Sequence, residues 1–532
     1  MRYDCVIVGG GIAGLTAAAY SSRASLTTLL IEKEDKVGGL VSSFPYKDYI
    51  FDGGIRSIEN SGIVRPMLKQ LGIDVSFLES TVSIGIEDKV IKVTSKESVD
   101  DYQKLLIEKF PDSQKDIQAI IQEIKKIMKY LDILYGIDNP LFFDVKTNKK
   151  FYITRVFPWI FKYLFTYKKI ERLQTPVDEY LKKFTSNQSL IDVIGQHFFY
   201  KTPAFFALSY FSLFLDYRYP KGGTGSLIKA MESYNKNQGT DIRTNTSIVY
   251  VNTEERYVKD NDGNKYEYDQ LIWASDNRSL YQLLDVDRIP MGKEKEDVLN
   301  RKKETSQAHG GDSIFTVYLG TNLPTDYYQN KCSGHFFYTP IKDGLNDYLY
   351  KKDELDLTNK KEVKSWLKGY IRLNTFEIAI PGLRDESLAP SGKTGLVVST
   401  LMDYKIVKAV EDQGWYKEFK ALCEEYMVEA LNTSIFQGFK EHIEVQFSSS
   451  PLTIKKRTNN TDGAITGWGF DNSVMPAVTS LPGIGKSVKT PIKHVYQAGA
   501  WSYSPSGLPI SILTGKLAAD KVIKNRKHAS NS

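Results

Sequence analysis

The stretch YDCVIVGGGIAGLTAAAYSSRA at residues 3–24 decides the fold that this sequence predicts. Its opening letters, YDCVIV, form an apolar run typical of a strand, and LTAAAYSSRA has the small residues of a helix packed closely on a sheet. Between them, Gly9, Gly11 and Gly14 have the GxGxxG spacing. The first glycine permits a tight turn, the second lets backbone approach a pyrophosphate, and the third lets helix and strand pack closely. The stretch therefore predicts a dinucleotide-binding fold.

A carboxylate at the expected distance supports this prediction. The apolar run at residues 26–31 ends directly before Glu32. In dinucleotide-binding folds an acidic residue about 20 positions after the glycines accepts hydrogen bonds from ribose hydroxyls. The preceding helix would direct its free N–H groups and partial positive charge at the phosphates. A glycine-rich turn without a ligand is the alternative for a lone motif, but the order strand, turn, helix, strand and acid favours nucleotide binding.

Composition excludes other classes of protein. The 532 residues carry a formal net charge of +6, with 41% apolar and 25% charged residues, as in ordinary globular proteins. This small charge does not predict nucleic acid binding, which requires a concentrated basic face. Cys5, Cys332 and Cys423 lie far apart and form no CxxC pair, so we expect no metal site and free thiols in a reducing compartment.

Two further stretches resemble the FAD signature of the glutathione-reductase-like flavoproteins. KEDKVGGLVSSF, at residues 33–44, has a Gly-Gly pair after the acidic residue, and HVYQAGAWSYSPSGLPISILTGKLAADKVI, at residues 494–523, resembles the closing segment of those proteins. A helix is expected to begin near Pro509, and its N-terminus would stabilise negative charge on the pyrimidine edge of a flavin. The resemblance implies FAD rather than NAD, held by both ends of the chain.

The glycine motif and this resemblance together predict the residues that contact FAD. Residues 54–56 follow an FDGG turn that would return the chain to the flavin, and a backbone group of Ile248 is expected to hold the adenine. The full predicted set is Gly9, Gly11, Ile12, Ala13, Gly14, Glu32, Lys33, Gly38, Gly39, Leu40, Gly54, Ile55, Arg56, Ile248, Ala274, Gly499, Ala500, Leu508, Pro509 and Ile510.

The whole pattern resembles the phytoene desaturase, carotenoid isomerase and retinol saturase family of FAD-dependent oxidoreductases. Besides both ends, the segments TPVDEYL, YPKGGTGSL and DGAITGWGF carry the resemblance. It implies hydride exchange between the flavin and a carbon of an apolar polyene or isoprenoid, in desaturation, saturation or isomerisation. Because no second GxGxxG occurs in a strand–turn–helix context, we expect a diffusible electron donor or acceptor.

Two alternatives stay open on the same fold. One is a flavin amine or porphyrinogen oxidase, although amine oxidases typically have Arg after the Gly-Gly pair, where this chain has Leu40. The other is a lipid-binding protein without flavin chemistry, similar to GDP-dissociation inhibitors. His197, His335 and His442 are candidate acids or bases, but a structural role is the simpler interpretation of each, and the sequence assigns no catalytic side chain.

The predicted fold class is α/β, with a Rossmann-like, glutathione-reductase-like FAD-binding domain and an interleaved α+β substrate domain. We expect residues 1–80, 219–285 and 455–532 to form the FAD-binding domain, and residues 81–218 and 286–454 to form the substrate-binding domain. The sequence does not predict the oligomeric state.

One part of the substrate domain is a candidate for peripheral membrane contact. At residues 150–216 aromatic and cationic side chains interleave as they do at membrane interfaces, although buried aromatic helices are the alternative. The apolar spacing of Pro111 to Tyr135 predicts a helix just before this part. A strand beginning at Tyr3 leaves no room for a signal peptide, so we expect a cytoplasmic protein, with any membrane contact on the inner face.

Overall fold

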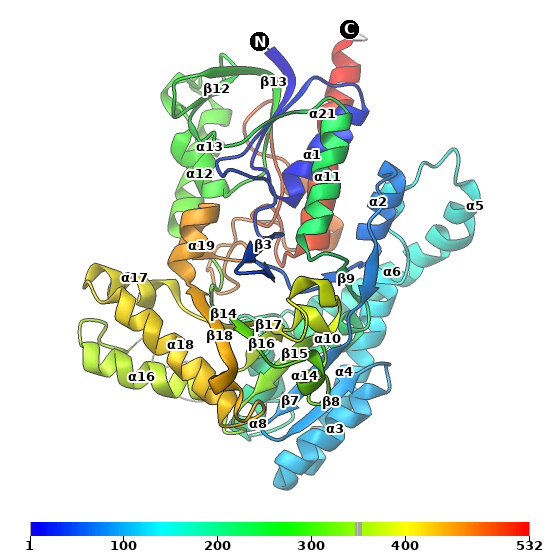
Figure 1. The fold of residues 1–532 in the computed structure, drawn as a ribbon. Coiled ribbons are helices and arrows are strands. Elements are labelled where there is room, and N and C mark those ends of the chain that lie inside the picture. Colours follow the sequence, from blue (N-terminus) through cyan, green and yellow to red (C-terminus); the bar gives the residue numbers. More distant parts are fainter. Residues whose placement is uncertain (1, 346–347, 349–353, 531–532) are drawn as a thin grey trace.

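The computed structural model describes residues 2–345, 348 and 354–530. Two seven-stranded sheets dominate it, and Figure 1 shows one above the other, with both chain termini at the end of the first sheet. The first sheet consists of β1 (Arg2–Val8), β2 (Thr28–Ile31), β10 (Asp241–Arg243), β11 (Ile248–Asn252), β12 (Tyr257–Asp260), β13 (Lys265–Trp273) and β19 (Val495–Gln497).

The centre of the first sheet is parallel. Strand β1 lies between β2 and β13 and is parallel to both, while β10 and β19 add parallel strands to β2 and β13. Strands β11 and β12 extend the sheet in antiparallel fashion. Every residue of β2 is buried, as expected where helices cover both faces of a parallel sheet. The predicted α/β class with a Rossmann-like sheet is confirmed.

Helix α1 (Ile12–Arg23) packs against both α11 (Gly225–Asn237) and α21 (Leu508–Ser530), as Figure 1 shows. Its alanines are fully buried, because only small side chains allow helices to approach this closely. A Cβ atom added to Gly515 would lie 2.3 Å from the carbonyl oxygen of Ala13. The two ends of the chain therefore pack on each other directly.

The second sheet is assembled from distant parts of the chain. Its order is β18-β14-β17-β16-β15-β7-β8, and neighbouring strands are antiparallel except for the parallel pair β15 and β7. The strands are β7 (Val82–Ile86), β8 (Lys89–Val93), β14 (Ile314–Thr321), β15 (His335–Thr339), β16 (Phe376–Ala379), β17 (Thr394–Leu401) and β18 (Ile443–Ser449).

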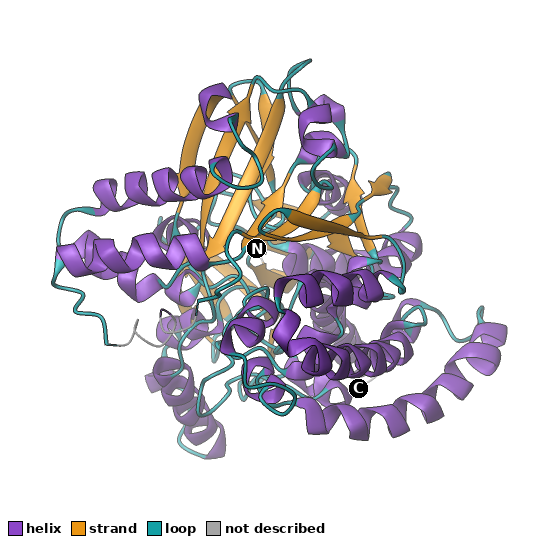
Figure 2. Ribbon diagram, turned by 90° about the horizontal axis from the view of Figure 1, so that it is seen from below, coloured by secondary structure: helices purple, strands orange, loops and turns teal. Residues whose placement is uncertain are grey.

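The two faces of this sheet differ in chemistry. Alternate residues of a strand point to opposite faces, so Phe336 and Ile378 enter an apolar core while His335 and Glu377 face the other way. The helices that contribute to this core are α16 (Lys360–Leu373), α17 (Tyr404–Asp412) and α18 (Tyr416–Asn432). Figure 2 shows helices to either side of the gathered strands. The opposite face is free to carry polar groups toward the first sheet.

The helical part beside the second sheet contains residues 150–216, for which membrane contact is predicted. The predicted helix is confirmed, since a short 3-10 turn at Pro111–Ser113 leads into α4 (Gln114–Tyr135). After it come α5 (Lys149–Phe151), the π-helical turn η3 (Tyr152–Val156) and α6 (Phe157–Ile170). Helices α9 (Ala204–Leu208) and α10 (Tyr210–Phe214), by contrast, contribute most of their side chains to a buried core.

Two small sheets join the large ones around Asp52. This residue ends β4 (Tyr49–Asp52), which pairs with β3 (Ser43–Tyr46), and only 1% of it is exposed. Its carboxylate accepts hydrogen bonds from the Tyr219 hydroxyl at 2.6 Å, from the Ser43 hydroxyl at 2.7 Å, and from the backbone N–H and the hydroxyl of Thr224, both at 2.9 Å. Tyr219 lies on β9 (Tyr217–Pro220), which pairs with β5 (Ile58–Glu59) and β6 (Phe77–Glu79). Asp52 thus connects distant segments.

We expect Asp52→Ala to lower the free energy of unfolding by about 3 kcal/mol or more, because it leaves several buried donors without an acceptor. Urea denaturation followed by fluorescence measures this. The exposed Asp74→Ala is the matched control and should change stability little. Equal stability of the two variants would contradict the connecting role of Asp52.

Candidate functional site

A cavity of about 420 Å³ is lined by residues of both large sheets. Its wall includes most of the residues predicted to contact FAD, from both ends of the chain. These are Gly9, Gly11, Ile12, Ala13, Glu32, Lys33, Gly38, Gly39, Leu40, Gly54, Ile55, Arg56, Ile248, Ala274, Gly499, Ala500 and Leu508.

Three predicted residues, Gly14, Pro509 and Ile510, are not part of this wall. Gly14 lies one helical turn into α1, where an added Cβ would be 1.9 Å from the carbonyl oxygen of Gly9. Its smallness therefore serves the packing of helix on strand. Pro509 and Ile510 follow Leu508 in the first turn of α21, and Ile510 is buried.

The glycine turn forms a cradle suited to phosphate. Gly9 has φ +108°, and an added Cβ would lie 2.7 Å from the carbonyl oxygen of Ala274. At Gly11, which begins α1, an added Cβ would meet no atom within 4 Å, so the backbone there faces open space. No side chain caps this helix N-terminus, which leaves its first N–H groups available to an anion. Gly38 holds the neighbouring loop in place by donating its N–H to the Gly10 carbonyl at 2.9 Å.

Glu32 stands at the end of β2, beside this cradle. Its carboxylate accepts the N–H of Gly10 at 2.7 Å and the N–H of Glu34 at 3.0 Å. Burial raises the pKa of Glu32, and the two backbone hydrogen bonds oppose that rise. The carboxylate is held rigidly at the cavity wall, where ribose hydroxyls would find an acceptor.

Several buried polar atoms of the cavity wall have no hydrogen-bond partner among the described residues, and they indicate what kind of ligand the cavity fits. Ser42 Oγ, Arg56 Nε and Ser506 Oγ are buried, line the cavity, and have no hydrogen-bond partner. Such groups cost free energy when they stay unpaired, so their position indicates a ligand with several polar atoms. A dinucleotide with phosphates, ribose and a heterocyclic ring satisfies that requirement, and the residues present therefore fit FAD.

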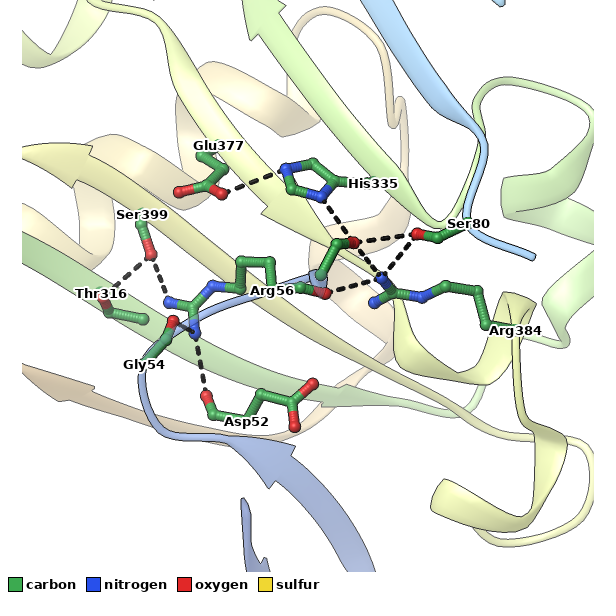
Figure 3. Close-up of polar contacts among 10 residues, drawn as sticks. Asp52, Gly54, Arg56, Ser80, Thr316, His335, Glu377, Arg384 and Ser399 are labelled. Atoms are coloured by element: carbon green, nitrogen blue, oxygen red, sulfur yellow. Dashed lines mark hydrogen bonds and ion pairs between the residues drawn. The ribbon is translucent and has the colours of Figure 1, made fainter. Parts of the chain in front are cut away.

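The second sheet contributes the floor of the cavity. Thr316 of β14 pairs with Ser399 of β17, and Ser399 pairs with Glu377 of β16, so three polar side chains cross the sheet in one row. Arg56 reaches this row by donating to Ser399 Oγ at 2.7 Å, and it also donates to the carbonyl oxygens of Asp52 and Gly54 (Figure 3). Arg56 thereby ties the FDGG turn to the second sheet at the site.

The family of the chain follows from its sequence match. Residues 12–318, more than half of the chain, match the family described as flavin-containing amine oxidoreductase. The chain belongs to this family. It is an FAD-dependent oxidoreductase, and FAD is its cofactor.

Relatives of this flavin-containing oxidoreductase are similar along their whole length. The phytoene desaturase of Fusarium fujikuroi is 21% identical over 100% of this chain and 91% of the relative. The 4,4'-diapophytoene desaturase (4,4'-diaponeurosporene-forming) of Staphylococcus aureus (strain COL) is 19% identical, with 98% of each chain covered. The expected resemblance to phytoene desaturases is confirmed, at low identity.

Solved structures share the fold of this oxidoreductase. An oxidoreductase from Methanosarcina mazei superimposes with a TM-score of 0.61 at 16% identity, covering 98% of this chain and all of the other. Wild-type putrescine oxidase bound to putrescine gives a TM-score of 0.60 at 15% identity, covering 98% of this chain and 99% of the other. At these identities the likeness shows a common fold.

His335 lies on the cavity floor of this flavoprotein within a hydrogen-bonded network (Figure 3). Its Nδ1 is 3.0 Å from the Ser57 hydroxyl, and its Nε2 is 3.1 Å from the carboxylate of Glu377. Ser57 also contacts Ser80 at 2.9 Å and accepts from Arg384 at 3.1 Å. Burial lowers the pKa of His335 and outweighs the opposing effect of Glu377, and Arg384 and Arg56 lower it further, so the ring is neutral at neutral pH.

The other two candidate histidines, His197 and His442, do not line the larger cavity. His197 is buried, with an unpartnered Nε2, and burial lowers its pKa to about 4. It lines a smaller cavity of about 110 Å³ whose wall shares Phe199 and Glu377 with the larger one. His442 contacts Asn322 at 2.7 Å in an exposed position away from both cavities. Of the three, His335 alone lines the larger cavity.

Sequence reasoning missed Glu59 and Glu377, both of which line the larger cavity. Glu59 follows the FDGG turn by only a few residues, and this proximity is a signal that could have identified it. Glu377 stands in FEIAI, which resembles any short strand, and nothing in its neighbourhood marks a site. It reaches the cavity through pairing of β16 with β15 and β17.

Gly11→Val and Gly14→Val should separate binding from folding. Because an added side chain at Gly11 points into open cavity, we expect Gly11→Val to fold normally but to lose at least about 90% of its bound FAD through collision with the phosphates. Gly14→Val should instead unfold at lower temperature even without FAD, because its Cβ would overlap the Gly9 carbonyl. Flavin absorbance per protein and thermal unfolding of flavin-free protein measure the two effects. Full FAD binding by Gly11→Val would refute the phosphate cradle.

Proposed function

We propose that this enzyme exchanges a hydride between FAD and a carbon of an apolar polyene or isoprenoid. The observation that carries the proposal is the aromatic lining that the larger cavity shares with the smaller one. Phe199, Phe206, Tyr210 and Tyr217 line both cavities. Aromatic side chains of this kind suit an extended apolar ligand. The names of the full-length relatives, phytoene desaturase and 4,4'-diapophytoene desaturase, support the same substrate class.

The predicted domains and FAD contacts belong to this proposal. Residues 1–80, 219–285 and 455–532 form the FAD-binding domain, and residues 81–218 and 286–454 form the substrate-binding domain. Bound FAD supplies the atom that accepts or donates hydride. The glycine turn holds its phosphates, Glu32 its ribose, and the N-terminus of α21 faces its pyrimidine edge. A diffusible electron donor or acceptor completes the turnover.

A cationic amine is the less favourable substrate, although amine oxidases share the fold. Arg56 and Arg384 both lie close enough to Glu377 to lower its carboxyl pKa. Because both guanidinium groups are buried, their charges are poorly screened, and an ammonium ion beside Glu377 would be repelled by two cations. Leu40, where amine oxidases typically have Arg, agrees with this argument.

A test of the proposed function uses the polyenes named for the relatives. We expect anaerobic FAD-loaded protein mixed with phytoene or 4,4'-diapophytoene in detergent to lose oxidised-flavin absorbance and to form a product with a longer conjugated system. Stopped-flow spectroscopy and chromatography of the product measure both changes, with putrescine as the comparison substrate. Flavin reduction by putrescine and by neither polyene would refute the proposal in favour of an amine oxidase.

We further propose that η3 and α6 bind a membrane surface peripherally. Among the side chains of this segment, Ile153 is 70%, Phe157 62% and Phe165 74% exposed, which is unusual for large apolar groups. Exposed cations accompany them at Lys149, Lys150, Arg155, Lys162, Lys168 and Lys169. Apolar rings with lysines nearby match an interfacial helix on an anionic surface. Among the described residues no helix is long and apolar enough to cross a membrane.

Three serine substitutions on this segment test membrane binding. We expect Phe157→Ser, Phe161→Ser and Phe165→Ser together to weaken binding to anionic phospholipid vesicles at least about tenfold, because each ring loses its burial in the lipid interface. Vesicle flotation measures the bound fraction. Val249→Ser, Met291→Ser and Val474→Ser, which replace exposed apolar residues elsewhere, form the matched control. Equal binding by both triple variants would contradict the proposed surface.

A further inference from the structure

Besides Glu32 and Glu34 at the glycine turn, two more carboxylates, Glu377 and Glu59, line the larger cavity. Glu377 rises from the floor of the second sheet and lines the smaller cavity as well. Protein surrounds it on all sides, yet 37% of its side chain is accessible, so the accessible part faces the internal space. Glu59 lies in the opposite small sheet, close to Gly507 at the start of α21. Both can reach a ligand in the cavity.

The surroundings of Glu377 favour its ionised form. Desolvation by burial opposes ionisation, but the contact with His335 and the charges of Arg56 and Arg384 outweigh it, and the pKa of Glu377 is lowered. His335 Nε2 lies 3.1 Å from the Glu377 carboxylate without hydrogen-bond geometry, and with the ring neutral Nδ1 can accept from the Ser57 hydroxyl. The charges of Arg56 and Arg384 lower the pKa of Glu377 in addition to the effect of His335.

The surroundings of Glu59 favour its protonated form. Burial, together with the nearby Asp216 carboxylate, raises the pKa of Glu59 to about 7. The hydroxyls of Tyr210 and Tyr217 form a hydrogen bond with each other and lie near both glutamates, as the pKa shifts of the two tyrosines indicate. Tyr135 of α4 is also near Glu59. No cation of the described residues contributes to the pKa shift of Glu59. The surroundings of Glu377 and Glu59 therefore shift the pKa values of the two groups in opposite directions.

Formation of a carbon–carbon double bond requires a proton acceptor as well as the flavin. Two C–H bonds on adjacent carbons break and one C=C bond forms; one hydrogen leaves with both electrons as a hydride to the flavin, and the other leaves as a proton. We propose that the Glu377 carboxylate accepts this proton and returns it when the reaction runs toward saturation. His335 is the positioning residue that orients Glu377. The inference rests on the proposed function and names a group within that same site.

Glu377 suits this role better than Glu59 because a proton acceptor must be ionised before it reacts. It stands next to the aromatic lining of both cavities, where an apolar substrate would lie. His335 and Ser399 flank it on neighbouring strands, so its position is fixed by the sheet rather than by a mobile loop. Among the described residues, Glu377 is the only carboxylate that lines both cavities.

The experiment measures anaerobic flavin reduction by 4,4'-diapophytoene in FAD-loaded wild type, Glu377→Gln, Glu59→Gln and His335→Phe. We expect Glu377→Gln to reduce its flavin about 10²- to 10⁴-fold more slowly, with unchanged FAD content and unchanged polyene binding measured by fluorescence quenching. The exposed Glu425→Gln is the matched control. His335→Phe keeps an aromatic ring against Tyr217 and Phe337 but removes a group that lowers the pKa of Glu377.

The pH profile distinguishes the two carboxylates. With Glu377 as acceptor, the wild-type rate stays constant from about pH 6 to about pH 8, because the carboxylate is ionised throughout. With Glu59 as acceptor, the rate would rise with pH through about 7. In His335→Phe the raised pKa of Glu377 should make the rate fall as the solution becomes acidic, an effect that a merely structural histidine would not produce.

Infrared spectra of the FAD-loaded proteins give a readout that does not depend on turnover. At about pH 6, we expect Glu377→Gln to lack an ionised-carboxylate band of the wild type and Glu59→Gln to lack a protonated-carboxyl band. A Glu377→Gln rate within threefold of wild type, a wild-type rate that rises through about pH 7, or a protonated Glu377 at pH 6 would each overturn the inference. A wild type inert toward both polyenes would instead refute the proposed function, and the inference with it. If Glu377→Gln fails to retain FAD, the wild-type pH profile shows whether Glu377 or Glu59 accepts the proton.

Discussion

The close approach of α1 to its neighbours is the constraint on which the rest of the structure depends. Gly14 lies against the carbonyl of Gly9, and Gly515 lies against the carbonyl of Ala13, at distances that no side chain would allow. The first contact seats the helix on β1 with its N-terminus over the cavity, and the second brings α21 from the far end of the chain beside it. Without both contacts, the cofactor wall would lack one of its two halves.

The second sheet adds polar side chains to the cavity that the cofactor-binding fold forms. Alternation along its strands sends Phe336 and Ile378 into an apolar core and leaves His335 and Glu377 on the face toward the cavity. Polar side chains on a buried sheet face are costly unless they are paired. Here Arg56 donates to Ser399, and Ser57 contacts His335, which lies beside Glu377. These contacts also join the second sheet to the segment that follows β4. Cohesion of the fold and polarity of the site therefore depend on one network.

The enclosed environment gives two glutamates different protonation states within one cavity. Glu377 lies near two guanidinium groups, whereas Glu59 lies among tyrosines and an aspartate. In water both groups would be ionised at neutral pH, because solvent would screen their neighbours. Inside the protein, the neighbouring charged and polar groups determine how readily each carboxyl group ionises. An apolar substrate has no polar group that could assist proton transfer. A flavin oxidoreductase acting on such a substrate therefore needs a side chain in the right protonation state, which these different surroundings provide.

The sequence by itself determined the cofactor half of this protein. Gly9, Gly11, Glu32 and the Gly-Gly pair act through local backbone geometry, which follows from residue type and spacing over a few positions, and for this reason the strand, turn and helix around them could be predicted. The closing segment could be predicted because Gly499 and Leu508 stand in an equally local pattern. The exposed apolar face of α6 and the burial of residues 204–214 could not be separated, because both segments are equally rich in aromatic residues.

Only the tertiary structure decided the composition of the cavity floor. His335, Glu377 and Ser399 come from three strands whose pairing no local pattern records, and Arg56 contacts Ser399 across more than 300 positions of sequence. Their protonation states depend on burial and on charges brought together from these distant segments. Backbone conformation is governed by neighbours in sequence, whereas the electrostatics of a buried site are governed by neighbours in space.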